Sequence, residues 1–357
     1  MTASVSHTYY PASRTRLPEF DLLRSFAILG VVIIHVSGAF LPEVERGSSF
    51  NLMLLAINQL QRFCVPTFIL LSGFWLSYVP QNFENPNATL KKRLLRVVPP
   101  YVLWSLIFEF FYIFIVKNRS LSNIIPNLIL GKSVYVYYFI ILILQFYLLW
   151  WILVKFKIKT IGTRGLAIAL GVQLGSTLVR YSALFGIIPP LHYLSDRLIL
   201  DWVFFFILGW YIGQHYERVR PWVISRKKEI WMAIACAIAL TIYERNAIYF
   251  SSLTINDANN FTKLSSQIYA VLFFLGCLPF DRTLKPLKTL SRYSFAIYLI
   301  HAPIVNLEGR LLIHHFFVPI FPSFLLLLIG VLVLNVTFIY ALEKLLPKSA
   351  SRYLLGL

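Results

Sequence analysis

Two ionisable residues stand out in the first long apolar stretch of the sequence. Arg24 precedes this stretch, His35 lies inside it, and no Asp, Glu, Lys or Arg occurs between Ser25 and Pro42. On a helix with 3.6 residues per turn, Arg24 and His35 share nearly the same face, roughly 16 Å apart along the axis. An ionisable group inside a membrane helix is costly, so it indicates a function. The alternative is a histidine that only bonds a neighbouring helix.

These residue types suggest a general base beside an anion-binding site on one helix face. A neutral imidazole beside a hydroxyl can act as a general base. Arg93 and Arg96 stand at another helix entrance, and guanidinium groups spaced i, i+3 can hold a phosphate from one helix face. A face that leads from an anion-binding entrance to a base suits a long donor with an anionic head and a reactive tail, which is the shape of an acyl-CoA. Membrane topology alone also places arginines at helix ends, so the geometry leaves the donor's identity open.

Other polar residues in apolar segments are candidates for supporting roles. Arg62 and Glu109 are expected at comparable depth on adjacent spans, where they would form a structural ion pair or serve the site. His301 would assist His35, bind the acceptor or bond a neighbour. Ser72 precedes a glycine, and this pair is expected chiefly to allow close helix packing.

The composition is that of an integral membrane protein. Of 357 residues, 58% are hydrophobic and 13% are charged, and the mean hydropathy is +0.70. We predict an all-α bundle of about ten transmembrane helices, with one transmembrane domain over residues 19–346 and cytoplasmic tails at 1–18 and 347–357. The first helix is too long for the apolar part of a cleaved signal peptide. The cysteines lie in apolar segments, so neither a disulfide framework nor a metal site is expected. The expected helices are 20–40, 52–78, a third that follows Pro99-Pro100 and ends near 116, 134–154, 164–181, 198–214, 229–243, 264–280, 294–313 and 321–342.

The distribution of positive charge supports this count and its orientation. With both termini in the cytoplasm, every inner loop carries more Lys and Arg than either neighbouring outer loop, as the positive-inside rule requires. Much of the net charge of +18 is therefore topological, and no nucleic-acid partner is expected. Anionic membrane lipids would favour the same orientation.

Several blocks of the sequence resemble the acyltransferase-3 family of integral membrane acyltransferases. The match runs from about residue 20 to 342, and its first three blocks are the most specific. The blocks are Arg24 with His35, Phe68-Ile-Leu-Leu-Ser72-Gly73-Phe74, Lys92-Arg93-Leu-Leu-Arg96-Val-Val-Pro99-Pro100-Tyr101, Phe205-Phe206-Ile-Leu-Gly209, and Ser291-Arg-Tyr-Ser294-Phe-Ala-Ile-Tyr298-Leu-Ile-His301.

The resemblance implies transfer of an acyl group, usually acetyl from acetyl-CoA, to a hydroxyl of an extracytoplasmic or lipid-linked glycan. His35 would be catalytic, and Arg24, Arg93 and Arg96 would bind the coenzyme. Tyr298, in the last block, would be a supporting residue. The resemblance further implies a bacterial plasma membrane and other cell-envelope polysaccharide enzymes as partners. Some members of the family carry a fused extracytoplasmic hydrolase-like domain, and this chain resembles the members that consist of the membrane domain alone. The glycan would therefore meet the membrane domain directly, or a separate partner would take the acyl group.

Two other protein classes fit parts of the sequence. A transporter or flippase of a glycan or a lipid-linked precursor would also have many spans and buried Arg, Glu and His, although no matching halves of the kind found in transporters are present. A structural membrane subunit would not need a base at His35. The acyl chain, the acceptor sugar, the oligomeric state and the choice between direct transfer and an acyl-histidine stay open.

Overall fold

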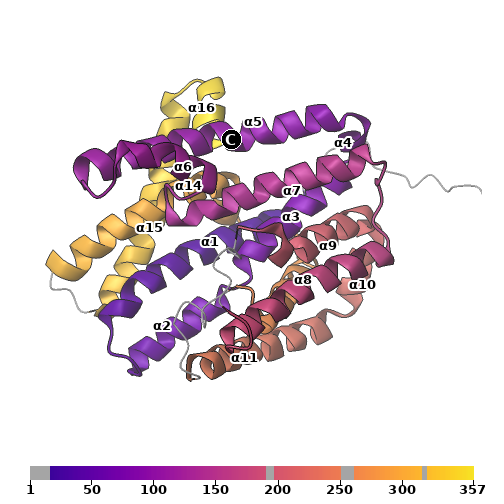
Figure 1. Ribbon diagram of the computed structural model, residues 1–357, viewed down its shortest axis with the longest axis horizontal. Coiled ribbons are helices and arrows are strands. Elements are labelled where there is room, and N and C mark those ends of the chain that lie inside the picture. The colour runs from indigo at the N-terminus through magenta and orange to yellow at the C-terminus, as the bar shows by residue number, and fades with distance from the viewer. Residues whose placement is uncertain (1–16, 190–196, 251–260, 316–319) are drawn as a thin grey trace, which may run out of the picture.

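Helices form nearly all of the structure. The computed structural model describes residues 17–189, 197–250, 261–315 and 320–357, and these ranges contain no β-strand. Figure 1 shows the helices as one bundle. They are α1 Pro18–Phe40, α2 Ser49–Leu60, α3 Cys64–Tyr78, α4 Gln81–Glu84, α5 Pro86–Phe110, α6 Ile124–Leu130, α7 Tyr138–Lys155, α8 Thr163–Leu184, α9 Val203–Gln214, α10 Tyr216–Ser225, α11 Lys227–Phe250, α13 Leu264–Cys277, α14 Lys285–His315, α15 Ile320–Leu345 and α16 Lys348–Leu355.

Five segments of the described chain are long and apolar enough to cross a membrane. They are Pro18–Glu43, Ser49–Tyr78, Pro86–Ile115, Leu121–Lys155 and Phe321–Leu345. Two further apolar helices, α9 and α13, are shorter. The prediction of an all-helical, multi-pass membrane protein is therefore confirmed. The count of ten spans, the cytoplasmic position of the termini and the domain boundaries stay predictions, and residues 1–16 of the expected N-terminal tail lie outside the described residues.

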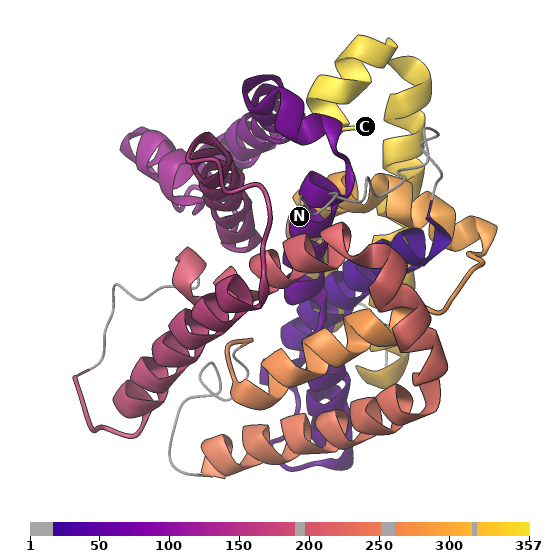
Figure 2. The same ribbon diagram turned by 90° about the vertical axis from the view of Figure 1, so that its right-hand side faces the viewer.

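Helix α1 lies at the centre of the bundle. It packs against α2, α3, α13, α14 and α15, as Figures 1 and 2 show from two directions. Most of its side chains are buried, including Phe20, Leu23 and Ala27. This central position brings both ends of α1 into contact with several other helices.

Helices α3 and α9 approach each other closely because glycines face the contact. A Cβ atom on Gly73 would collide with the carbonyl oxygen of Phe206, and one on Gly209 would collide with the carbonyl oxygen of Leu70. Small residues allow such contact between membrane helices. The close packing expected at Ser72-Gly73 is thus present, and Gly73 is the residue that allows it.

The structure differs from the predicted helices in two places that bear on the site. The single helix expected over 52–78 is broken at residues 61–63 into α2 and α3. Pro66 lies in the first turn of α3, and a proline there cannot donate to the carbonyl of Arg62. Helix α5 begins at Pro86 and continues through Pro99 and Pro100, whereas the sequence predicted that the third helix follows those prolines. The Asn85 side chain accepts a hydrogen bond from the backbone N–H of Ala88 at 3.0 Å and caps this earlier start.

The segment expected only as a C-terminal tail contains helix α16, which packs on α5. The indole nitrogen of Trp104 donates to the carbonyl oxygen of Leu354 at 2.9 Å. Gly356 follows the helix with φ of 68°, a left-handed conformation that favours glycine. These contacts fix the end of α16 beside α5.

Candidate functional site

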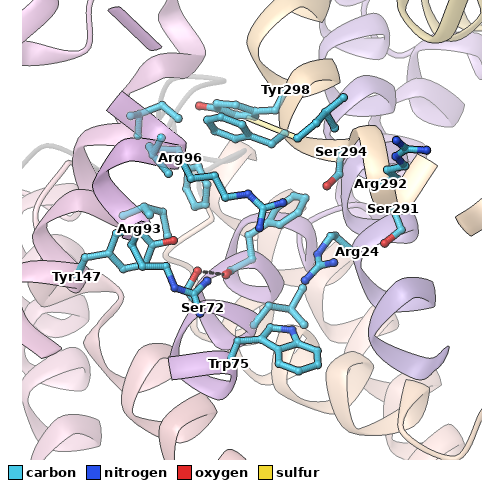
Figure 3. A pocket seen from close by; sticks show the side chains of 18 residues that line it. Arg24, Ser72, Trp75, Arg93, Arg96, Tyr147, Ser291, Arg292, Ser294 and Tyr298 are labelled. Carbon is cyan, nitrogen blue, oxygen red and sulfur yellow. Dashed lines mark hydrogen bonds between the residues drawn. The ribbon is translucent and has the colours of Figure 1, made fainter. Parts of the chain in front are cut away.

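A cavity of about 300 Å³ lies among α1, α3, α5, α7 and α14. Figure 3 shows its side chains, in which the guanidinium groups of Arg24, Arg93 and Arg96 converge on the open space. Ser72 and Tyr298 also line the cavity. Five of the site residues predicted from the sequence therefore meet in one place, although they come from four different helices. We call this cavity the arginine pocket.

The arginines of this pocket differ in how their side chains are bonded. Among the described residues, no hydrogen bond or ion pair involves the side chain of Arg24 or Arg93, while Arg96 Nε donates to the carbonyl oxygen of Gly356 at 2.9 Å. The nearby carboxylate of Asp21 accepts a hydrogen bond from Ser291 Oγ at 2.8 Å. The pocket thus holds guanidinium groups whose donors are available to an anion.

Sequence reasoning missed several residues of the pocket. Trp75, Tyr147, Ser291, Arg292 and Ser294 line it. Arg292 forms an ion pair with Glu343 of α15. The indole nitrogen of Trp75 is buried and has no hydrogen-bond partner among the described residues, so it is a further donor for a ligand. Ser291 and Ser294 belong to a block that was recognised, and that block was the signal that could have indicated them.

Ser72 and Tyr298 line the pocket with side chains that are already bonded. Ser72 Oγ donates to the carbonyl oxygen of Phe68 at 2.9 Å, a bond drawn in Figure 3. The Tyr298 hydroxyl donates to the carbonyl oxygen of Val136. Both hydroxyls are therefore held in place by backbone groups.

His35 and His301 form a pair beyond the arginine pocket and do not line it. Their ring centroids are 5.2 Å apart, and the ring of Tyr135 stands edge-on to His35 at 5.0 Å. Tyr298 lies 6.1 Å from His301, centroid to centroid. Tyr298 therefore connects the two regions, because it lines the pocket and also packs beside the histidine pair.

Arg62 and Glu109 do not pair, so the expected ion pair is wrong. Arg62 donates to the side-chain oxygen of Asn58 and lies 4.5 Å from the ring centroid of Phe261. Glu109 instead accepts hydrogen bonds from Arg119 and Asn127, both at 2.8 Å. Arg119 lies on the loop after α5 and Asn127 lies on α6. Depth along the spans alone did not indicate these partners.

The chemistry available here is anion binding beside an imidazole pair. Within the described residues, no three His, Cys, Asp or Glu side chains cluster closely enough to hold a metal ion. The arginine pocket can bind phosphate groups, and an imidazole can accept or donate a proton. The arrangement suits the transfer of a group carried by an anionic donor.

Comparison with known proteins gives the chain a family. An acyltransferase domain of the acyltransferase-3 type matches residues 17–343. The chain is similar to the probable poly-beta-1,6-N-acetyl-D-glucosamine export protein of Staphylococcus aureus strain MSSA476, with 27% identity over 300 residues that cover 81% of this chain and 82% of the relative. A protein of the same name from Staphylococcus epidermidis is 26% identical over 301 residues, 81% of each chain. No solved structure matches significantly. Because the domain match covers most of its length, this chain belongs to the acyltransferase-3 family.

Proposed function

We propose that the protein is a membrane O-acyltransferase that moves an acyl group, most simply acetyl, from cytoplasmic acyl-CoA to a hydroxyl of an extracytoplasmic or lipid-linked glycan. The observation that carries this proposal is the arginine pocket, in which two guanidinium groups have no bonded partner among the described residues and face a common cavity. Family membership supports the reaction class. A glycan acceptor is supported by the printed names of the relatives, which refer to export of a polysaccharide.

In the proposed complex, Arg24, Arg93 and Arg96 bind the phosphate groups of the coenzyme. A cavity of about 300 Å³ is at the lower end for small-molecule sites, so it would take only part of the coenzyme. The acyl-bearing arm would extend past Tyr298 toward the histidines. Bacterial relatives and the basic inner loops support a bacterial plasma membrane.

His35 is the proposed general base. It accepts the proton of the sugar hydroxyl as the oxygen attacks the thioester carbonyl, and the C–S bond then breaks to release coenzyme A. The half-buried His35 side chain has no hydrogen bond among the described residues, so both ring nitrogens are available. Direct attack and a transient acyl-histidine use the same groups.

The first test is acyl transfer by purified protein in lipid nanodiscs, with acetyl-CoA as donor and a poly-β-1,6-N-acetylglucosamine oligosaccharide as acceptor. We expect His35→Ala to lower the rate of thioester cleavage by about 10²- to 10⁴-fold without loss of folded protein. His215→Ala is the control, because His215 follows the C-terminal end of α9 and does not line the arginine pocket. Near-normal transfer by folded His35→Ala protein would end the role assigned to His35.

A second function is favoured by one observation, since the relatives are named as export proteins. An exporter would use the arginine pocket for an anionic, lipid-linked precursor. It would move a glycan across a vesicle membrane without acyl-CoA and without thioester cleavage. The same nanodisc assay, repeated in sealed vesicles, separates the two functions, because only the acyltransferase consumes the thioester.

A further inference from the structure

His301 has a defined tautomer because of its backbone contacts. Its Nδ1 lies 3.0 Å from the carbonyl oxygen of Ile297 and 2.9 Å from that of Tyr298. Carbonyl oxygens only accept hydrogen bonds, so Nδ1 must carry the proton. In a neutral imidazole, Nε2 is then a bare acceptor. The residue that points into the bundle beside His35 is therefore an acceptor there.

This acceptor has no partner among the described residues. The His301 side chain is fully buried, and Nε2 makes no hydrogen bond. Buried polar atoms are seldom left unbonded, and each such atom calls for an explanation. The ring of His35 is 5.2 Å away between centroids, which is within reach of an N–H···N bond of about 2.9 Å after a small rotation of either ring.

The hydrogen bond from His301 to its own helix does not explain why Nε2 is buried without a partner. His215 makes the same type of contact, with Nδ1 2.9 Å from the carbonyl oxygen of Tyr211. The His215 side chain is half-buried and has no buried, unbonded ring nitrogen, whereas Nε2 of His301 is buried and unbonded beside His35. The two histidines share the backbone contact and differ in what the second nitrogen meets.

We infer that His301 is a positioning residue for His35. Its Nε2 accepts the N–H of the His35 ring, which fixes the His35 tautomer and leaves the opposite nitrogen bare toward the acceptor hydroxyl. The hydroxyl proton moves to that nitrogen, the new C–O bond forms, the C–S bond breaks, and the proton leaves with the coenzyme thiolate. The bond to His301 also stabilises the His35 imidazolium in this step. This inference rests on the proposed acyl transfer.

The test compares His301→Gln with His301→Met. The two side chains have similar length, but only the amide oxygen of glutamine can accept the His35 N–H. We expect kcat of the methionine variant to fall about 100-fold, with KM for acetyl-CoA unchanged, and the glutamine variant to stay within about tenfold of wild type. His215→Met is the matched control and should keep the wild-type kcat. A folded methionine variant with wild-type kcat, or a glutamine variant as slow as the methionine variant, would overturn the inference.

A second readout needs no substitution at 301. Nitrogen NMR of wild-type protein, labelled at histidine and saturated with coenzyme A, should show one N–H···N coupling between two imidazoles that is lost in His35→Ala. Absence of that coupling would contradict the inference even if His301→Met failed to fold. The outcomes also separate the two claims. Inactive wild-type protein would remove the proposed function, whereas active wild type, inactive His35→Ala and normal His301→Met would remove only the role of His301.

Discussion

The arginine pocket and the C-terminal end of helix α5 differ in whether their charged side chains are paired. In the pocket, Arg24 and Arg93 face a cavity with no bonded partner among the described residues. Further along α5, roughly 24 Å from Arg93, the carboxylate of Glu109 is fully buried and bonded to Arg119 and Asn127. Paired charges hold elements together, whereas charges kept unpaired in a cavity cost stability and are typical of ligand sites.

The same contrast extends to other elements. Asp201, before α9, accepts hydrogen bonds from Arg180 and Ser176 of α8. Glu244 of α11 accepts from Tyr181 of α8 and from the backbone N–H of Ser265 at 3.0 Å. These carboxylates join neighbouring helices to each other. Among the described residues, no carboxylate is bonded to Arg24 or Arg93 in the arginine pocket, so we expect the two regions to respond differently to substitution.

The largest effect is expected for the double variant Arg24→Ala/Arg93→Ala. Each hydrogen bond to a charged group contributes about 1.5–3 kcal/mol, so KM for acetyl-CoA should rise at least about 100-fold, while the unfolding temperature should hold or rise. The control is Lys91→Ala/Lys92→Ala, whose exposed lysines precede Arg93 on the same helix. An unchanged KM in the arginine variant would show that these groups do not meet the donor.

Glu109→Leu should have the opposite profile. It leaves Arg119 and Asn127 without their acceptor, so the free energy of unfolding should fall by about 3 kcal/mol, while KM for the donor stays unchanged in the folded fraction. Denaturant titration measures the loss, and Glu45→Leu in an exposed turn is the control. If Glu109→Leu raised KM for acetyl-CoA as the arginine variant does and left the free energy of unfolding unchanged, the proposed difference between the two regions would be wrong.

Arg96→Ala should have a smaller effect than the double variant. The Nε–H group of Arg96 already bonds the carbonyl oxygen of Gly356, so fewer of its N–H groups are available to acyl-CoA. We therefore expect KM for acetyl-CoA to rise about tenfold. Kinetics with Arg96→Lys beside it would show how much of the effect is charge alone. A rise above that of the double variant would mean that Arg96 is the main anion-binding residue.

Ionic strength should have the smallest effect. The pocket is partly enclosed, so salt should weaken donor binding by only a few-fold between about 0.05 and 0.5 M. The dependence should be steeper in wild type than in Arg24→Ala/Arg93→Ala, as measured by KM at each salt concentration. Equal salt dependence in both proteins would argue against direct contact between these arginines and phosphate.

The sequence predicted the parts of the site that depend on local spacing. Arg24 and His35 lie on one helix, and Arg93 and Arg96 lie on another, so helical periodicity was enough to group each pair. That both arginine sets meet in one pocket depends on how α1, α3, α5 and α14 pack. The resemblance to a family supplied the expectation that they belong together.

Other features could not be read from the sequence for physical reasons. Arg119, one partner of Glu109, lies on a loop, and loop conformation has no periodic signal. Asn127, the other partner, lies on the separate helix α6. The bond from Arg96 to Gly356 joins residues far apart in the chain. The break between α2 and α3 followed from Pro66, but a proline in a long apolar run is also compatible with a continuous kinked helix. The contact between His35 and His301 required the packing of α1 against α14.

The most direct test of the central claim is equilibrium binding of coenzyme A and of pantetheine to purified wild-type protein in lipid nanodiscs. If the arginine pocket holds the phosphates of the donor, coenzyme A should bind at least about 100-fold more tightly than pantetheine, which lacks those phosphates, and Arg24→Ala/Arg93→Ala should abolish the difference. Equal affinity for the two compounds, or no coenzyme A binding by folded wild-type protein, would contradict the account and favour an exporter.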